Sequence, residues 1–182
     1  MSKELVIDKT AGATDIIPLH AGQEHCAPSH RFGPFARNEY LIHYCLSGEG
    51  VLEDKYGTHR IKAGELFVIR PGEITVYQAH AERPWHYVWI GFCGKRAAVF
   101  STERSVYACP DSVFRRLCTL IESKESAADI YTATIHEIIY HIVIVHVALD
   151  FGKRILFAFR TRKQMIDNFV NGGSINISCT FL

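Results

Sequence analysis

The stretch RNEYLIHYCLSGEGVLEDKYGTHRIKAGELFVIRPGEITVYQAH, Arg37 to His80, decides the fold of this 182-residue chain together with PWHYVWIGFCG, Pro84 to Gly94. Short apolar or alternating runs are separated here by turn pairs such as Ser47-Gly48 and Pro71-Gly72. That rhythm is typical of consecutive antiparallel strands. The predicted strands are Glu39 to Leu46, Gly50 to Lys55, His59 to Lys62, Glu65 to Arg70, Thr75 to His80 and Trp85 to Phe92.

The first and the last of these strands are apolar on both alternating faces. One face must therefore line the interior of a small barrel while the other packs on a further layer. We predict a mainly β fold with α-helices, in which an antiparallel barrel of the jelly-roll type precedes a helical hairpin. A small barrel with an aromatic lining is a natural binding cup.

The residues before the barrel form an arm. Asp15 to Cys26 is predicted to supply one or two edge strands, and Ala27 to Phe35, which contains proline and glycine, is predicted to be a loop. We expect this arm to cover the mouth of the cup.

The pattern becomes helical after Gly94. Asp111 is the predicted N-cap of a first helix with one apolar stripe, and a second helix is predicted from Ile130 to Asp150. The two helices form an antiparallel hairpin, with one apolar surface for the barrel and another for a second copy of the chain. The expected domains are 1–108 (barrel with arm), 109–152 (dimerisation hairpin) and 153–182 (basic linker and the start of a further domain).

Composition excludes several classes of function. With 48% hydrophobic residues, 21% charged residues and a net charge of +1, the chain has no global attraction to nucleic acid or to an anionic membrane. The start MSKELVIDKT lacks the apolar core of a signal peptide, which favours a cytoplasmic location. Because the most apolar run, Ile138 to Leu149, is shorter than the ~20 residues of a membrane span, we expect no membrane insertion.

Ten histidines raise the question of a metal site. His136 and His141 are five residues apart, so on a helix they point in different directions and cannot share one ion. His20, His25, Cys26 and His30 fit no established zinc spacing and fall in the predicted arm and loop.

The barrel also raises the question of a metal-binding cupin, which would need a histidine shortly after the Pro71-Gly72 turn and a HxH pair on an earlier strand. The sequence has Thr75 and only His43 there. We predict no metal, no cofactor and no catalytic residue, and keep a metal-dependent cupin enzyme, a sugar isomerase or dioxygenase, as the alternative.

Aromatic residues are the better indication of function. Trp85, Tyr87 and Trp89 share one face of their strand. Sugar rings stack their C–H faces on aromatic rings, so such a wall fits a carbohydrate or a similar small polar ligand. The alternative, that these rings only fill a core, stays open at this point.

Three motifs carry a resemblance to a known family. They are GPFARNEYLIHYCLSGEGVLE (Gly33 to Glu53), IKAGELFVIRPGEITVYQA (Ile61 to Ala79) and PWHYVWIGFCG (Pro84 to Gly94). In these motifs the chain resembles the N-terminal effector-binding and dimerisation half of AraC-type bacterial transcription regulators, particularly those of sugar operons. The resemblance implies a cupin-like barrel that binds a small effector, often a sugar, and a helical hairpin that forms a homodimer.

The resemblance also implies roles for individual residues. By position, Tyr77, Tyr87 and Trp89 match ligand-facing aromatics. Arg37 and Arg31 lie where the family places an arginine near the ligand hydroxyls, and His43 is an adjacent candidate.

Full members of the family continue into a DNA-binding half with two helix-turn-helix units. KQMIDNFVNGGSINIS, Lys163 to Ser178, resembles its opening, and the chain then ends in CTFL. DNA binding is therefore expected only through a C-terminal half that this chain lacks.

Overall fold

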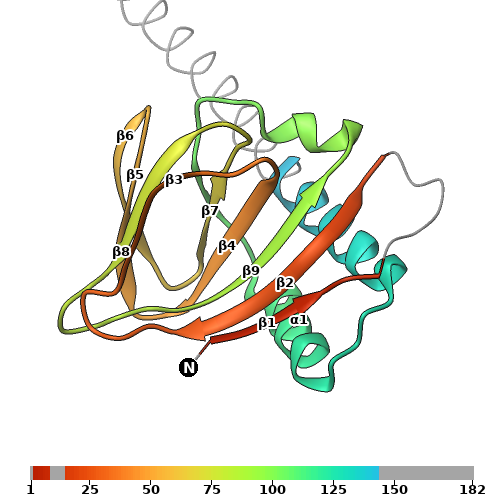
Figure 1. Cartoon of the computed structure of the whole chain (residues 1–182), viewed down its shortest axis with the longest axis horizontal. Helices are drawn as coiled ribbons and strands as arrows, with labels where there is room; N and C mark the ends of the chain where they lie inside the picture. The colour runs from red at the N-terminus through yellow and green to blue at the C-terminus, as the bar shows by residue number, and fades with distance from the viewer. Residues whose placement is uncertain (1, 9–14, 144–182) are drawn as a thin grey trace, which may run out of the picture. The chain divides into compact units, whose positions relative to one another are not determined.

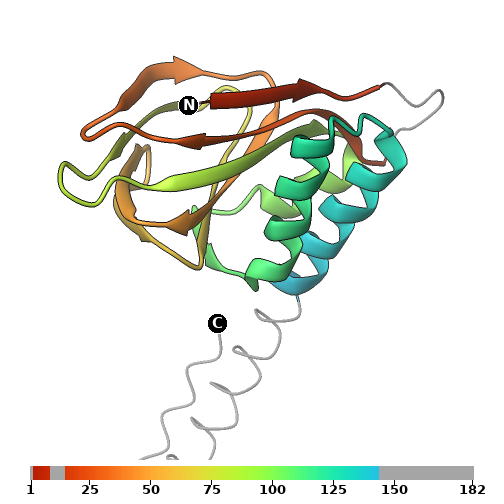
Figure 2. The same cartoon turned by 90° about the horizontal axis from the view of Figure 1, so that it is seen from below.

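The computed structural model describes residues 2–8 and 15–143, which form two antiparallel sheets, two α-helices and a short 3-10 helix, Lys95–Phe100 (Figures 1 and 2). The second part of the predicted hairpin, 144–150, and the predicted basic linker, 153–182, lie outside the described residues. The described part of the chain up to Ile142 belongs to one compact unit.

The larger sheet has six strands in the order β1-β2-β9-β4-β7-β10, and the smaller has four in the order β3-β8-β5-β6. Every neighbouring pair is antiparallel. This arrangement confirms the predicted jelly-roll type of barrel. The strands are β1 Ser2–Val6, β2 Ile17–His25, β3 Arg31–Ala36, β4 Tyr40–Ser47, β5 Glu49–Asp54, β6 Gly57–Lys62, β7 Glu65–Ile69, β8 Ile74–Ala79, β9 His86–Cys93 and β10 Val106–Ala108.

The six strands predicted between Glu39 and Phe92 are confirmed as β4 to β9, but two predictions for the arm are wrong. The predicted loop contains most of β3, which pairs with β8 and whose register shifts between Phe32 and Phe35. Gly33, at a φ of 95°, and Pro34 occupy this irregularity, where the ladder tolerates both residue types. The second error concerns β2, which is an internal strand because β1 pairs along its outer side.

Two hydrophobic cores lie on opposite faces of the larger sheet. Inside the barrel, Leu41 and Cys45 of β4 pack with Tyr87 and Trp89 of β9. On the outer face, the alternate residues of the same strands pack against the helices: Ile42, Tyr44, Val88, Ile90 and Phe92. The prediction that the two faces of β4 and β9 serve two different layers is therefore confirmed.

The helices cover the outer face of the larger sheet (Figure 2). Helix α1, Asp111–Ser123, stacks Phe114 on Tyr44 with 4.0 Å between ring centroids. The predicted N-cap is wrong by one residue: Pro110 is the cap, while Asp111 begins the helix and accepts a hydrogen bond from Arg115 at 2.7 Å.

The second helix covers residues 128–143 of the described chain, which confirms the prediction of helix there. Tyr131, Ile135, Ile138 and Ile142 on it are buried in the outer core. Within the described ranges, no helix combines the length and apolarity that crossing a membrane requires.

Candidate ligand-binding site

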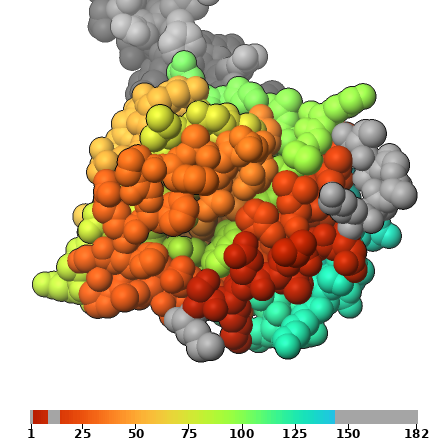
Figure 3. Space-filling view, in the orientation of Figure 1, coloured from red at the N-terminus to blue at the C-terminus, as the bar shows by residue number. Residues whose placement is uncertain are grey.

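A cavity of about 340 Å³ opens inside the barrel. Figure 3 shows the face on which red and orange residues of the first strands border a hollow, with green atoms of a later segment visible between them. The cavity brings together β1 to β4, β8 and β9. Its lining contains five of the six predicted site residues, namely Arg37, His43, Tyr77, Tyr87 and Trp89.

Arg31, the sixth predicted residue, does not line the cavity. Its side chain is exposed, and its Nη1 donates to the carbonyl oxygen of Gly33 at 3.2 Å. Phe32, its neighbour on β3, does line the cavity and stacks on Tyr77 with 5.2 Å between centroids. Because successive strand residues point to opposite faces, a β3 that presents Phe32 inward must present Arg31 outward.

His43 lies at the centre of an aromatic box. Its ring stacks on Phe67 at 4.6 Å and lies 5.0 Å from Tyr77, 4.9 Å from Tyr87 and 6.1 Å from Trp89. The alternation of β4 turns His43 inward, and the register places it opposite Trp89 on β9. Ring faces and ring edges therefore surround one buried imidazole.

This imidazole is neutral and has an unused polar atom. Burial, followed by electrostatic interaction with Arg37 and His20, holds the pKa of His43 well below its ordinary value of 6.5. Nδ1 of His43 and Nε of Arg37 are buried without a hydrogen-bond partner among the described residues. A buried polar group without a partner is costly, so both atoms are suited to a polar ligand.

The depressed pKa of His43 makes the stability of the fold dependent on pH. Below pH 6.5 the unfolded chain binds a proton that the folded chain does not, so stability falls as the pH drops below that value. We expect His43 to contribute up to about 1.4 kcal/mol of this loss per pH unit, and His86, whose pKa burial lowers to about 4, to contribute in the same direction. Urea unfolding at pH 7, 6 and 5 would measure this, and His43→Gln should flatten the decline. An equal decline in both proteins would contradict the assignment.

Arg37 supplies the positive charge at the cavity. Its guanidinium lies over the rings of Phe32 at 5.1 Å and Phe35 at 5.7 Å, and its Nη1 is 3.7 Å from Glu39 Oε1. The Arg37 carbonyl oxygen accepts a 2.8 Å hydrogen bond from the Gly72 amide, which fixes the backbone of the turn. Aromatic stacking orients the guanidinium and leaves its edge for hydrogen bonds to a ligand.

Acidic residues from the arm, which the sequence analysis missed, complete the polar wall. Glu24 and Glu4 line the cavity. Glu24 Oε2 accepts a hydrogen bond from the Tyr87 hydroxyl at 3.1 Å, and Glu4 Oε1 is 3.4 Å from His20 Nδ1. The signal in the sequence was the alternation of His20, Gly22 and Glu24, three residues that β2 turns to one face.

The structure gathers three metal-ligand types at one point of this wall. One ligand atom each from Glu24, Cys26 and His30 lie within 4.8 Å of one another, the one such group among the described residues. Cys26 and His30 belong to the set considered in the sequence, whereas His25 stacks on His86 at 3.5 Å and His20 contacts Glu4. Burial raises the pKa of the Cys26 thiol to about 11, so the free thiol is protonated.

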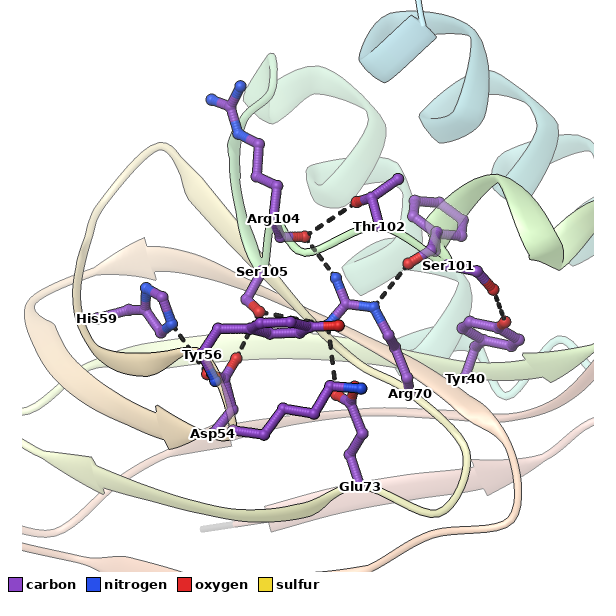
Figure 4. Close-up of polar contacts among 12 residues, drawn as sticks. Tyr40, Asp54, Tyr56, His59, Arg70, Glu73, Ser101, Thr102, Arg104 and Ser105 are labelled. Carbon is purple, nitrogen blue, oxygen red and sulfur yellow. Dashed lines mark hydrogen bonds and ion pairs between the residues drawn. The ribbon is translucent and has the colours of Figure 1, made fainter.

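A second polar cluster, shown in Figure 4, lies outside the cavity lining. Buried Arg70 donates to the Phe100 carbonyl oxygen at 2.7 Å and to Glu73 at 3.3 Å, and Glu73 pairs with Lys55 at 2.9 Å. Asp54 accepts a hydrogen bond from Ser105 in the same cluster. These contacts fasten the turn after β7 to the segment after β9, which is a structural role.

Known proteins share sequence with much of this chain. The family described as AraC-like ligand binding domain matches residues 18–143. The chain is 38% identical over 93 residues to the Msm operon regulatory protein of Streptococcus mutans, covering 51% of this chain and 34% of that protein. It is also 38% identical over 76 residues to the raffinose operon transcriptional regulatory protein RafR of Pediococcus pentosaceus, covering 41% and 27%.

Among solved structures, YhaK from Escherichia coli matches with a TM-score of 0.49 and 14% identity, over 60% of this chain and 50% of that one.

The chain spans about a third of the length of the curated relatives named above. The family match begins in β2, ends in the second helix and includes β3, β4, β8 and β9, which supply most of the cavity wall. This chain therefore belongs to the family of AraC-like ligand binding domains.

Proposed function

We propose that this chain is the effector-sensing and dimerising part of an AraC-type transcription regulator, and that its cavity binds a carbohydrate. The observation that carries the proposal is the cavity wall, in which aromatic rings from β8 and β9 face the same space as the Arg37 guanidinium and the Glu24 carboxylate. Rings take the C–H faces of a sugar, while the charged groups take its hydroxyls.

Size and relatives support the same ligand class. A volume of about 340 Å³ lies in the ordinary range of small-molecule sites. One relative is named for a raffinose operon, and another, 27% identical over 66 residues, is the lactose operon transcription activator of Staphylococcus xylosus. The relatives are named as regulators, which favours a regulator over the metal-dependent cupin enzyme considered from the sequence.

The helices support the proposed dimer. Ile130, Tyr140 and Val143 are exposed apolar residues of the second helix, the element expected to pair two copies. DNA would be bound by a C-terminal half, and the effector would bias how two such halves engage their sites. That coupling requires the effector to bind one arrangement of the dimer more tightly than another.

Thermal and urea unfolding against a panel of mono- and disaccharides, including galactosides and glucosides, tests the proposal. A bound sugar at a hundred times its Kd should stabilise the chain by about 2.7 kcal/mol. Arg37→Ala should weaken binding about 10- to 100-fold, because hydrogen bonds from a charged group are worth roughly 1.5–3 kcal/mol.

The matched control is Arg31→Ala, which removes an exposed arginine of β3 outside the cavity lining. It should leave the affinity for the sugar unchanged. Equal losses in the two variants, or stabilisation by no sugar of the panel, would contradict the proposed site.

A further inference from the structure

We propose that Glu24, Cys26 and His30 form a binding site for a divalent cation of the zinc class at the wall of the cavity. The site goes beyond effector binding and does not rest on it. Cysteine thiolate, imidazole and carboxylate are the three side-chain ligand types of zinc. Three protein ligands leave one tetrahedral position open for water or for a ligand oxygen.

The distances suit an ion of this size. Zinc bonds of about 2.0–2.3 Å in a tetrahedron place ligand atoms roughly 3.3–3.6 Å apart. The three ligand atoms already lie within 4.8 Å of one another. Rotation of the side chains alone can close the remaining difference, because Glu24 and His30 are only half-buried.

Backbone hydrogen bonds fix the segment that carries the three ligands. The Cys26 amide donates to the Trp85 carbonyl oxygen at 3.1 Å, which continues the pairing of β2 with β9 beyond His25. The His30 amide donates to the Ala27 carbonyl oxygen at 3.0 Å and so closes a turn. The carbonyl oxygen of His30 accepts from the Ala79 amide at 2.9 Å. The turn therefore holds His30 close to the end of β2. Because the backbone is already ordered, binding of an ion would cost little backbone entropy.

One hydrogen bond holds the Glu24 carboxylate. The Tyr87 hydroxyl donates to Oε2 at 3.1 Å. A carboxylate has two oxygens with several lone pairs, so this one hydrogen bond leaves capacity for an ion. Outer hydrogen bonds of this kind commonly orient ligating carboxylates.

The donor set predicts which ions bind. A thiolate and an imidazole favour zinc and cobalt, whereas magnesium and calcium prefer oxygen ligands alone. Because Glu24 and His30 both line the cavity, the ion would lie at the cavity wall.

Titration of the reduced full chain with Co²⁺, in the absence of sugar, tests the proposal. We expect a single ion per chain, visible-region bands of tetrahedral cobalt and a near-ultraviolet band from thiolate-to-cobalt charge transfer. Zn²⁺ should remove these bands by displacement, and a large excess of Mg²⁺ should not. Absence of the charge-transfer band, or equal competition by Mg²⁺, would overturn the proposal.

Variants locate the ion. Cys26→Ser should abolish the charge-transfer band. Cys118→Ser, which removes a half-buried thiol of α1, should retain the band. His30→Ala should weaken Co²⁺ binding at least tenfold, and His136→Ala on the second helix should not. Since His30 is outside both cores, its variant tests the site even if Cys26→Ser unfolds. A band that survives in His30→Ala at unchanged affinity would place the ion elsewhere. Because no sugar is present, failure of the effector proposal would leave this result intact.

Discussion

Arg70→Ala is expected to destabilise the fold by about 3–5 kcal/mol, the loss typical of breaking a buried ion pair from one side. The Arg70 side chain is only 6% exposed, and its nitrogen atoms donate hydrogen bonds to groups inside the protein. Nε donates to the Phe100 carbonyl oxygen at 2.7 Å, and Nη1 lies 3.3 Å from both Glu73 Oε2 and Ser105 Oγ.

The loss has two physical sources. Alanine would leave Glu73 buried beside Lys55 as its remaining cationic partner, and it would remove a donor from the Phe100 carbonyl oxygen. It would also release the segment after β9, which Arg70 holds through the carbonyl oxygens of Phe100 and Arg104. Urea unfolding followed by circular dichroism measures the change in free energy.

Arg60→Ala is the matched control. Arg60 pairs with Glu49 at 2.9 Å, but its side chain is 69% exposed. An ion pair in water contributes about 0–1 kcal/mol, so this variant should lose no more than that. If the two variants lost the same free energy of unfolding, burial would not be the reason why Arg70 stabilises the fold.

Most of the barrel could be predicted from the sequence because its strands are short and each is followed by a turn signal. Gly48, Gly57, Gly64 and Gly72 all have positive φ and lie between strands or next to their ends. The same logic misjudged β3, where Gly33 and Pro34 mark an irregularity inside a ladder. A glycine or proline indicates the local backbone geometry. It does not indicate whether the residues on either side of it pair with another strand.

The inward-facing residues of the site could be predicted for a similar reason. On β9 the period of two puts Tyr87 and Trp89 on one face, whichever strands are neighbours. The proposed roles of Glu24 and His30 could not be predicted, because they depend on how β2 pairs with β9 and on the turn that follows. The family resemblance places Arg31 near the ligand hydroxyls, whereas β3 presents Phe32 to the cavity and leaves Arg31 exposed outside its lining.

Pairing across long sequence separations also explains the candidate metal site. Local spacing groups His20, His25, Cys26 and His30 without distinguishing one from another. The ladder with β9 distinguishes them: His25 lies opposite His86, on which it stacks, whereas Glu24, which is outside that group, lies opposite Tyr87. The distances between side chains at the end of β2 follow from the register of β2 against β9. The spacing of residues along the sequence does not fix that register.

Trp85→Ala is expected to cost about 3–5 kcal/mol of stability, the range for removing a buried indole. Trp85 is 1% exposed and packs with Phe67 and Tyr87 at 5.8 and 5.7 Å between centroids. Its ring also lies against the backbone of Gly50, where an added Cβ would come within 2.3 Å of it. Trp85 does not line the cavity, so on this residue the core-filling alternative holds.

Trp89→Ala is the comparison within the same strand. Trp89 is 9% exposed and lines the cavity, so its loss enlarges an existing space. We expect a smaller loss of stability than for Trp85 and about tenfold weaker sugar binding, equivalent to roughly 1.4 kcal/mol of lost stacking. Urea unfolding and sugar titration of both variants measure the two effects. If Trp89→Ala unfolded the barrel, or if it left sugar affinity unchanged, Trp89 too would be a core residue, because a ring that only fills space contributes to stability and not to recognition.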